Sequence, residues 1–360
     1  MHSPKQADLQ QRVFENIDSL LGVPDASFQA EETPLAPLDF SGTLSLRGHQ
    51  IHIVGEVTSV GEPWAIRSAI HRLNEHRTQN PEHLALLVSE FIGPQGRALC
   101  KRYRVAYIDL LGNCYLEWGD VYIDKAREGA SSRMPKRAPS LFSDRASLVI
   151  RSALDAPGRP QKVRELSREL GLSPAWVSQV LQRLVSAGYA ARVGDATVIS
   201  RPLDLLNDWA ESYSFAGRND VRPFFCEAAT PEQVIARVAA VPPASVGRYA
   251  LTLHAGASLV APFSEFHEVH IYIDPSGLRR ETERQWIEAL GLQPVETGGN
   301  VYLTWPYYQE GVFYGSRQID GVWVVSDVQL YIDLYNYPMR GREQAEYLLR
   351  NRLAHLGDQG

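Results

Sequence analysis

The clearest pattern of hydrophobic and polar positions along the chain lies between residues 160 and 201. Gly171 ends a first amphipathic segment, in the position where a left-handed residue commonly follows a helix. Ser173 and Pro174 then provide an N-cap and a first helical residue for a second segment that runs to about Ala187. Both segments carry apolar residues at helical spacing: Val163, Leu166 and Leu170 in the first, and Val177, Val180, Leu181 and Leu184 in the second.

Two short strands are expected after these helices, over residues 189–193 and 197–199, with a turn at Gly194 and Asp195. A further helix is expected before residue 160, with Ser143 as its N-cap. That helix directs Leu148, Val149 and Leu154 inward and places Arg145 and Arg151 on its polar side. Helix, glycine turn, helix and hairpin follow one another in a winged helix-turn-helix. We therefore predict a winged helix-turn-helix DNA-binding domain over residues 143–201.

The amino-terminal pattern predicts an α/β domain over residues 1–130. The expected helices cover residues 5–22, 63–76 and 93–103. The expected strands cover residues 38–46, 51–57, 83–91, 105–110, 114–117 and 121–123, and the first two form a hairpin. Residues 131–142 form a basic linker, in which Arg133, Lys136 and Arg137 could follow a phosphate backbone or simply be solvated.

The hydrophobic and polar pattern of residues 202–360 predicts a second α/β domain. Its helices include residues 203–213 and 231–241, the latter with Thr230 as N-cap, and its strands include residues 249–254 and 268–274. The fold class is thus multidomain α/β (α+β), which suits a chain of 360 residues.

Charge is unevenly distributed along the chain. The net charge is −6, which argues against a protein that coats nucleic acid indiscriminately. Residues 131–201, however, hold 12 Lys and Arg against 5 Asp and Glu. A basic module between acidic neighbours is typical of a confined nucleic-acid site, so double-stranded DNA is the expected partner.

The second helix of the predicted motif has a polar face that could contact bases. Its outward residues are Trp176, Ser178, Gln179, Gln182 and Arg183. Glutamine pairs with adenine and arginine with guanine in a major groove. Ser173 is placed to bind a phosphate, as are Lys162, Arg164 and Arg192 on the flanking segments. Solubility is the simpler interpretation of each charge, and packing is the simpler interpretation of Trp176. Winged helices also serve as protein–protein modules.

Cysteine usage and hydropathy indicate a cytoplasmic protein. Cys100, Cys114 and Cys226 are widely spaced in apolar surroundings, which favours reduced core residues. No Cys/His cluster has zinc spacing, no apolar run is long enough for a membrane span, and the polar amino terminus is unlike a signal peptide. No cofactor is expected, and a homodimer is one open possibility.

The first domain resembles the restriction-endonuclease-like fold. Asp39 lies in one expected strand and Glu56-Val57-Thr58 follows in the next, in the manner of that family's Asp…Glu-x-Lys metal site. The resemblance implies that the carboxylates hold Mg²⁺ while the lysine helps to activate water. Thr58 cannot supply that positive charge. The candidate catalytic residues Asp39, Glu56 and Thr58 are therefore expected to form an inactive site. A Mg²⁺-dependent nuclease remains the alternative function.

The third domain is similar to nucleotidyltransferases over residues 256–274. Gly256 and Ser258 are followed ten residues later by Glu268 on a strand. The family needs two carboxylates one residue apart to hold Mg²⁺ under a triphosphate. His270 occupies the second position and Asp274 lies too far along, so we expect either a degraded scaffold or a chance similarity in the order of strands.

The carboxy-terminal motif resembles the AbiEi-class antitoxins of type IV toxin–antitoxin systems. Gln329-x-Tyr331-x-Asp333-Leu334 precedes Arg340-Gly341-x-Glu343, after a predicted winged helix. The resemblance implies a sequence-specific transcriptional regulator, acting on its own operon, with a cognate toxin as a further partner. Structural ion pairs and helix caps are the simpler interpretation of Asp327, Gln329, Asp333 and Arg340, and an interaction scaffold is a third function considered. Aromatic residues at 305–314 could form either an interface or a core.

Overall fold

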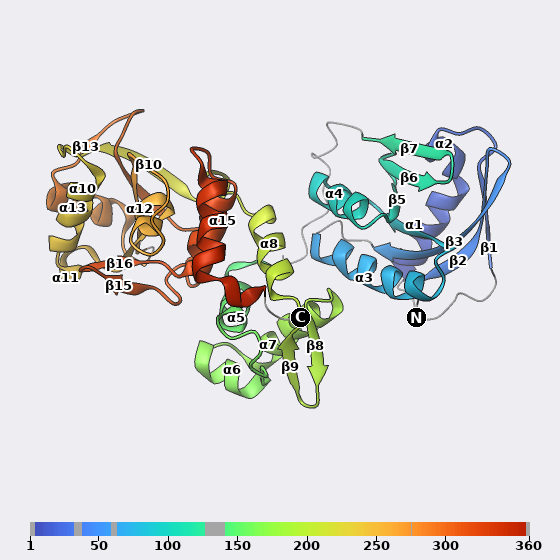
Figure 1. Cartoon of the computed structure of the whole chain (residues 1–360), viewed down its shortest axis with the longest axis horizontal. Coiled ribbons are helices and arrows are strands. Elements are labelled where there is room, and N and C mark those ends of the chain that lie inside the picture. Colours follow the sequence, from blue (N-terminus) through green and yellow to red (C-terminus); the bar gives the residue numbers. More distant parts are fainter. Residues whose placement is uncertain (1–3, 32–37, 59–62, 127–140, 275, 358–360) are drawn as a thin grey trace. The chain divides into compact units, whose positions relative to one another are not determined.

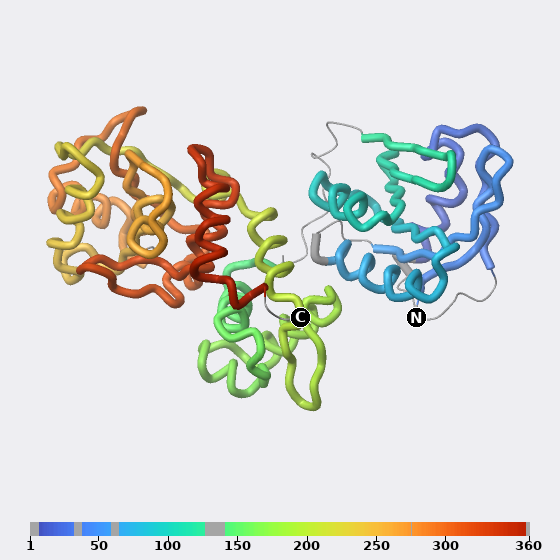
Figure 2. Tube along the Cα trace, viewed as in Figure 1, coloured from blue at the N-terminus to red at the C-terminus, as the bar shows by residue number. Residues whose placement is uncertain are grey.

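The protein is described by a computed structural model that covers residues 4–31, 38–58, 63–126, 141–274 and 276–357. Contacts group the chain into two compact units, residues 1–140 with 183–188 and residues 141–182 with 189–360. Figure 1 labels the elements, and Figure 2 traces the backbone of each unit. Both units are mixed α/β, so the predicted fold class is confirmed. Within the described residues, no helix is long and apolar enough to cross a membrane.

The first unit contains a seven-stranded sheet whose strands follow one another in sequence order. The central pairs β3–β4 and β4–β5 are parallel, and the outer pairs are antiparallel. The strands are β1 (Ser27–Ala30), β2 (Phe40–Leu46), β3 (His49–Thr58), β4 (Leu84–Ser89), β5 (Ala106–Asp109), β6 (Cys114–Trp118) and β7 (Val121–Lys125). The helices are α1 (Pro4–Glu15), α2 (Ile17–Leu21), α3 (Pro63–Gln79) and α4 (Pro94–Arg102).

Helices cover both faces of this sheet, because the central strands are apolar on both sides. Alternate residues of β3 enter different cores: Ile53 and Val57 pack with α1 and α2, whereas Val54 packs with α3 and α4. Cys100 and Cys114 are buried in these cores, and burial raises the pKa of the Cys114 thiol to about 11. The predicted reduced, structural role of the cysteines is consistent with this burial, and Cys226 is also buried as a free thiol.

Two predictions for the first unit are wrong. The single helix expected over residues 5–22 breaks at Asn16, whose backbone leaves the helical region at φ −121° and ψ 22° before α2 begins. Strand β1, which pairs with β2, lies between residues 22 and 38, where no helix or strand was expected. Its largely exposed side chains give little apolar alternation, so its sequence carries no strong strand signal.

Three helices and a hairpin follow residue 141 in the predicted order, and all of them belong to the second unit except residues 183–186 at the end of α7. These are α5 (Asp144–Asp155), α6 (Val163–Leu170), α7 (Pro174–Ser186), β8 (Ala190–Val193) and β9 (Ala196–Ile199). Gly171 has φ 66° at the end of α6, as its position predicted. The four expected apolar residues of α7 are fully buried. Gln161 forms an antiparallel bridge with Thr197, which attaches the start of α6 to β9.

A second seven-stranded sheet forms the rest of this unit, in the order β13-β10-β14-β12-β11-β16-β15. The strands are β10 (Asp220–Phe225), β11 (Tyr249–Thr252), β12 (Val269–Ile273), β13 (Gln293–Pro294), β14 (Val301–Trp305), β15 (Arg317–Ile319) and β16 (Val322–Val324). The helices are α8 (Pro202–Ser212), α9 (Phe215–Arg218), α10 (Pro231–Ala240), α11 (Pro243–Val246), α12 (Leu253–Ser258), α13 (Arg279–Leu290), α14 (Asp327–Tyr335) and α15 (Gly341–Arg352). The strand predicted to reach His254 therefore ends at Thr252.

Arg151 is buried, whereas the sequence placed it on the polar side of its helix. Its guanidinium lies 4.7 Å from the ring centre of Trp209 and 5.5 Å from that of Tyr308. It also donates a hydrogen bond of 2.5 Å from Nη2 to Gln329 Oε1 on α14. Helix α5 is thus joined to the carboxy-terminal region by a buried cation, and the boundary predicted at residue 201 falls inside the second unit.

The aromatic segment at residues 305–314 belongs largely to the core. Trp305, Tyr308 and Phe313 are buried, and Tyr308 accepts a 2.7 Å hydrogen bond from Trp209 Nε1. Such a role for aromatic residues with polar tips is common in protein interiors. The alternative that this segment forms an exposed interface is therefore wrong for these three residues.

Candidate nucleic-acid interface

Helix α7 begins with the local geometry that its sequence predicted. Gly171 takes the left-handed conformation and donates its backbone N–H to Ser167 O. Ser173 Oγ accepts a 3.3 Å hydrogen bond from the Trp176 N–H, which satisfies one amide of the first turn. The remaining first-turn amides are the kind of donors to which a phosphate binds.

The predicted contact residues lie on the surface. Exposed side chains are those of Lys162, Arg164, Ser173, Gln179, Gln182 and Arg192, whereas Ser178 and Arg183 are partly buried. Gln179 and Gln182 are three positions apart on α7, and Ser178 lies four before Gln182, so these three share one helix face. Trp176 is also partly buried, which agrees with a packing role.

The basic side chain of Lys162, near the exposed face of α7, forms only a weak ion pair. Lys162 Nζ lies 3.7 Å from Asp195 Oδ2 on the hairpin turn, and both side chains are largely exposed. An exposed ion pair of this length contributes little, so Lys162 can exchange Asp195 for a phosphate at small cost. Figure 1 shows α6, α7 and the β8–β9 hairpin forming one group of elements. The linker residues Arg133, Lys136 and Arg137 lie outside the described residues.

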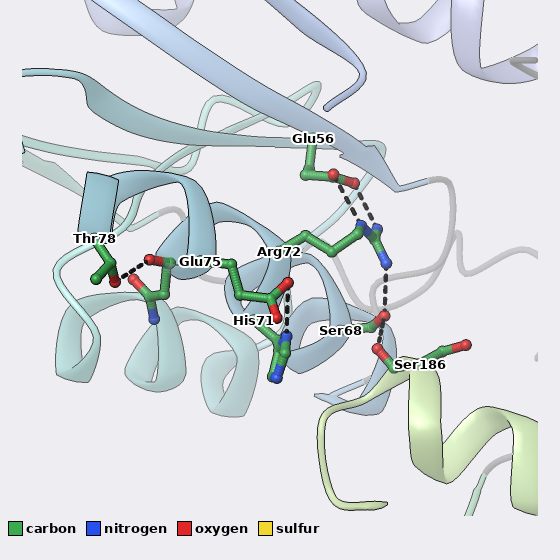
Figure 3. Close-up of polar contacts among 8 residues, drawn as sticks. Glu56, Ser68, His71, Arg72, Glu75, Thr78 and Ser186 are labelled. Atoms are coloured by element: carbon green, nitrogen blue, oxygen red, sulfur yellow. Dashed lines mark hydrogen bonds and ion pairs between the residues drawn. The ribbon is translucent and has the colours of Figure 1, made fainter. Parts of the chain in front are cut away.

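The carboxylates of the first unit are held by protein groups. Asp39 Oδ2 accepts a 2.7 Å hydrogen bond from the Val57 N–H, which ties the start of β2 to the end of β3. Glu56 is 1% exposed, and Arg72 reaches it from α3, with Nε 2.9 Å from Oε1 and Nη2 2.5 Å from Oε2 (Figure 3). Arg72 Nη1 also donates to Ser68 Oγ at 2.8 Å.

These contacts set the electrostatics of the Glu56 site. Burial raises the pKa of Glu56, while the hydrogen bonds and charge of Arg72 act in the opposite direction. The pKa of Arg72 is raised by its bond to Glu56. Sequence reasoning considered Thr58 for the missing cation and overlooked Arg72. Its place on an amphipathic helix, four residues after Ser68, was the one local signal.

The nucleotidyltransferase-like residues do not assemble two adjacent carboxylates. Glu268 lies beside His270, whereas Asp274, beyond the end of β12, lies 3.4 Å from Arg248 Nε and accepts the Ser276 N–H at 2.9 Å. Ser258 donates its hydroxyl to Ala255 O within α12. Across the described parts of the chain, no group of three His, Cys, Asp or Glu side chains could hold a metal ion.

The residues of the carboxy-terminal motif form a structural network. Asp327 pairs with Arg317 at 2.5 Å and with Arg352 at 3.3 Å, next to the N-cap Ser326. Gln329 Nε2 donates to Asp333 Oδ1 at 2.7 Å. Asp333 also accepts from Thr252 and from Tyr272, and burial raises its pKa to about 6. These contacts agree with the simpler, structural interpretation: Asp327 forms ion pairs, whereas Gln329 and Asp333 form buried hydrogen bonds.

Comparison with known proteins gave one similarity, in the carboxy-terminal part of the chain. Residues 198–354 match the family model described as transcriptional regulator, AbiEi antitoxin, type IV TA system. Neither the curated proteins nor the solved structures gave a match. The matched segment runs from the end of β9 to just beyond α15 and includes the motif at Asp327–Glu343. Residues 198–354 of this chain are thus similar to the AbiEi antitoxins, which are described as transcriptional regulators of type IV toxin–antitoxin systems.

Proposed function

We propose that the protein is a sequence-specific DNA-binding regulator that acts on its own operon through a winged helix-turn-helix at residues 143–201. The observation that carries this proposal is the polar face of α7, on which Gln179 and Gln182 are exposed and Ser178 is partly buried, in the helix that follows the Gly171 turn. A helix of this kind enters the major groove, where glutamine side chains discriminate between base pairs.

Phosphate contacts would come from the flanking elements. Lys162 and Arg164 lie at α6 and Arg192 lies on β8, and all three are exposed. They belong to the segment with 12 basic and 5 acidic residues, in a chain of net charge −6. Such local positive charge supports confined binding to double-stranded DNA rather than coating of nucleic acid.

The family description also supports a toxin partner. An AbiEi antitoxin opposes the toxin of a type IV system, and repression of the shared operon is the role proposed for this chain. If the protein acts as a homodimer, its operator would contain two half-sites about one helical turn apart or a multiple of that distance.

The first unit is proposed to be a restriction-endonuclease-like domain without nuclease activity. Arg72 occupies both oxygens of Glu56, which leaves this carboxylate engaged in an ion pair. Purified protein should not cut plasmid or linear DNA in Mg²⁺ or Mn²⁺. Cleavage that Glu56→Ala abolishes would instead establish the alternative nuclease function.

The DNA-binding proposal is tested by titration against a specific and a scrambled duplex at two salt concentrations. Gln179→Ala or Gln182→Ala should reduce discrimination by about 1–3 kcal/mol. Lys162→Ala or Arg192→Ala should weaken binding to both duplexes and reduce the salt slope by about 1.

Matched controls come from the distant surface of the second unit. Gln293→Ala and Arg280→Ala remove an exposed glutamine and an exposed arginine there, and both should leave binding unchanged. Equal losses on both duplexes for the Gln179 and Gln182 variants would contradict the assignment of the base-reading face.

A further inference from the structure

A cavity of about 680 Å³ lies in the second unit, beside the first residues of helix α12 and of strand β12. His254, Glu268, His270 and Tyr337 provide its polar wall, while Phe263 and Phe266 are among its apolar residues. The volume is in the range of small-molecule sites, which usually combine apolar walls with a few convergent polar groups.

His270 lines this cavity and has a buried ring nitrogen without a partner among the described residues. The residue is 3% exposed, and burial lowers its pKa, so the ring is neutral near pH 7. Its Nε2 lies 3.3 Å from Glu268 Oε2 and 3.1 Å from the Tyr337 hydroxyl, so the partners assign the ring proton to Nε2. Nδ1 is then a bare acceptor, and none of the described residues provides it with a hydrogen bond.

His254 adds a second acceptor. It is 7% exposed and burial lowers its pKa, which keeps it neutral as well. The backbone of Met339 can serve at most one of its two ring nitrogens. The other nitrogen has no partner among the residues that the structure describes, and a buried nitrogen without a partner costs stability unless a ligand completes its hydrogen bonding.

Glu268 supplies negative charge. Its carboxylate accepts hydrogen bonds from Tyr302 at 3.0 Å and Tyr337 at 2.9 Å. Together with His270 these donors lower the pKa of Glu268 to about 2, so it is ionised at any physiological pH. Glu265, which is exposed, adds a second carboxylate to the lining.

The one arginine of the described lining is already paired. Arg340 pairs with Glu343 through Nε at 2.9 Å and Nη2 at 2.6 Å, and the two lining carboxylates of Glu265 and Glu268 outnumber this one cation. The cavity therefore combines a carboxylate with two imidazole acceptors, and such a set suits a ligand rich in N–H donors. A transition metal is disfavoured, since the described residues contain no group of three ligands.

Backbone strain supports a ligand site at the same place. Leu253, next to His254, has φ 51°, and the cavity residues Met339 and Arg340 have φ 60° and 67°. Side chains other than glycine rarely adopt this region, and such strain collects at ligand clamps and active sites.

We propose that this cavity binds an organic cation with several N–H donors, a primary ammonium or guanidinium compound, through Glu268, His270 and His254. This site goes beyond DNA binding, and its test uses no DNA. Phe263, Phe266 and Tyr337 would cover the apolar part of the ligand, and the cationic group would donate to the carboxylate and to the two imidazoles.

Calorimetric titration of the full chain with agmatine and with putrescine tests the proposal. A saturable heat is expected for at least one of them in the millimolar range or below. Glutarate, which has a similar length and carries two carboxylates, and ATP with Mg²⁺ should give no binding heat, because the cavity offers acceptors and negative charge.

Variants locate the binding site. Glu268→Gln should weaken binding at least about tenfold, as expected for loss of a charge-assisted bond. Glu265→Gln changes an exposed residue and cannot disturb the core, so weaker binding in this variant also supports the proposal. Glu296→Gln is the matched control, since Glu296 is exposed and outside the lining, and binding should be unchanged. The proposal would be overturned if all three variants bound the cation with equal affinity, or if neither cation gave a binding heat. It would also be overturned if ATP bound and this binding were lost in Glu268→Gln.

Discussion

At the scale of single residues, the pairing of Glu56 with Arg72 determines what the first unit can do. Arg72→Ala leaves a buried carboxylate without its cation. The loss should be about 2 kcal/mol, below the 3–5 kcal/mol typical of fully buried pairs, because the Arg72 side chain is 38% exposed. Chemical denaturation measures it. The Glu56→Gln, Arg72→Ala double variant should recover much of the stability, and a double variant as unstable as Arg72→Ala would contradict this account.

Asp333 should make stability depend on pH. Its pKa of about 6 in the folded protein lies above the ordinary value of about 4, so the folded state binds an extra proton between these pH values. The stability contributed by protonated Asp333 is complete below pH ~4 and is lost as pH rises through 6. Relative to Asp333→Asn, the wild type should therefore lose about 2–3 kcal/mol between pH 4 and pH 7. Thermal unfolding of both proteins across this range checks the prediction, and a constant difference would contradict it.

At the scale of elements, the attachment of α5 to α14 depends on the contact between Arg151 and Gln329. A double-mutant cycle with Arg151→Met and Gln329→Met should show a coupling free energy of about 1–2 kcal/mol, because the two side chains share a buried hydrogen bond. The matched cycle pairs Arg201→Ala with Gln329→Met. Arg201 forms a local surface pair with Asp204, so this cycle should show coupling near zero. Equal coupling in both cycles would argue against the proposed attachment.

The sequence predicted most elements but not this attachment. Helix caps and apolar spacing are local signals, so α6, α7 and their turn could be predicted from residues 160–187. Arg151 was assigned to the polar face because burial of a charge is costly without partners. Those partners, Trp209, Tyr308 and Gln329, come from distant parts of the sequence, and periodicity within one helix cannot reveal them.

At the scale of the whole molecule, sites marked by local sequence signals could be predicted, whereas sites formed by distant segments could not. The carboxy-terminal motif indicated a resemblance to the AbiEi antitoxins, and residues 198–354 match the model of that family. The exposure of Gln179 and Gln182 on α7 could be predicted because exposure on a helix follows its period. The cavity around His254 and His270 could not, because strand β12, helix α12 and the segment at Tyr337 meet only in the folded chain.

The central claim is that residues 143–201 recognise a specific DNA sequence. Footprinting of the purified protein on the DNA upstream of its own gene tests it most directly. We predict a discrete protected segment that persists in excess nonspecific DNA and is lost in the Gln179→Ala, Gln182→Ala double variant. Uniform protection, or no protection at concentrations at which the protein binds any duplex, would contradict the claim.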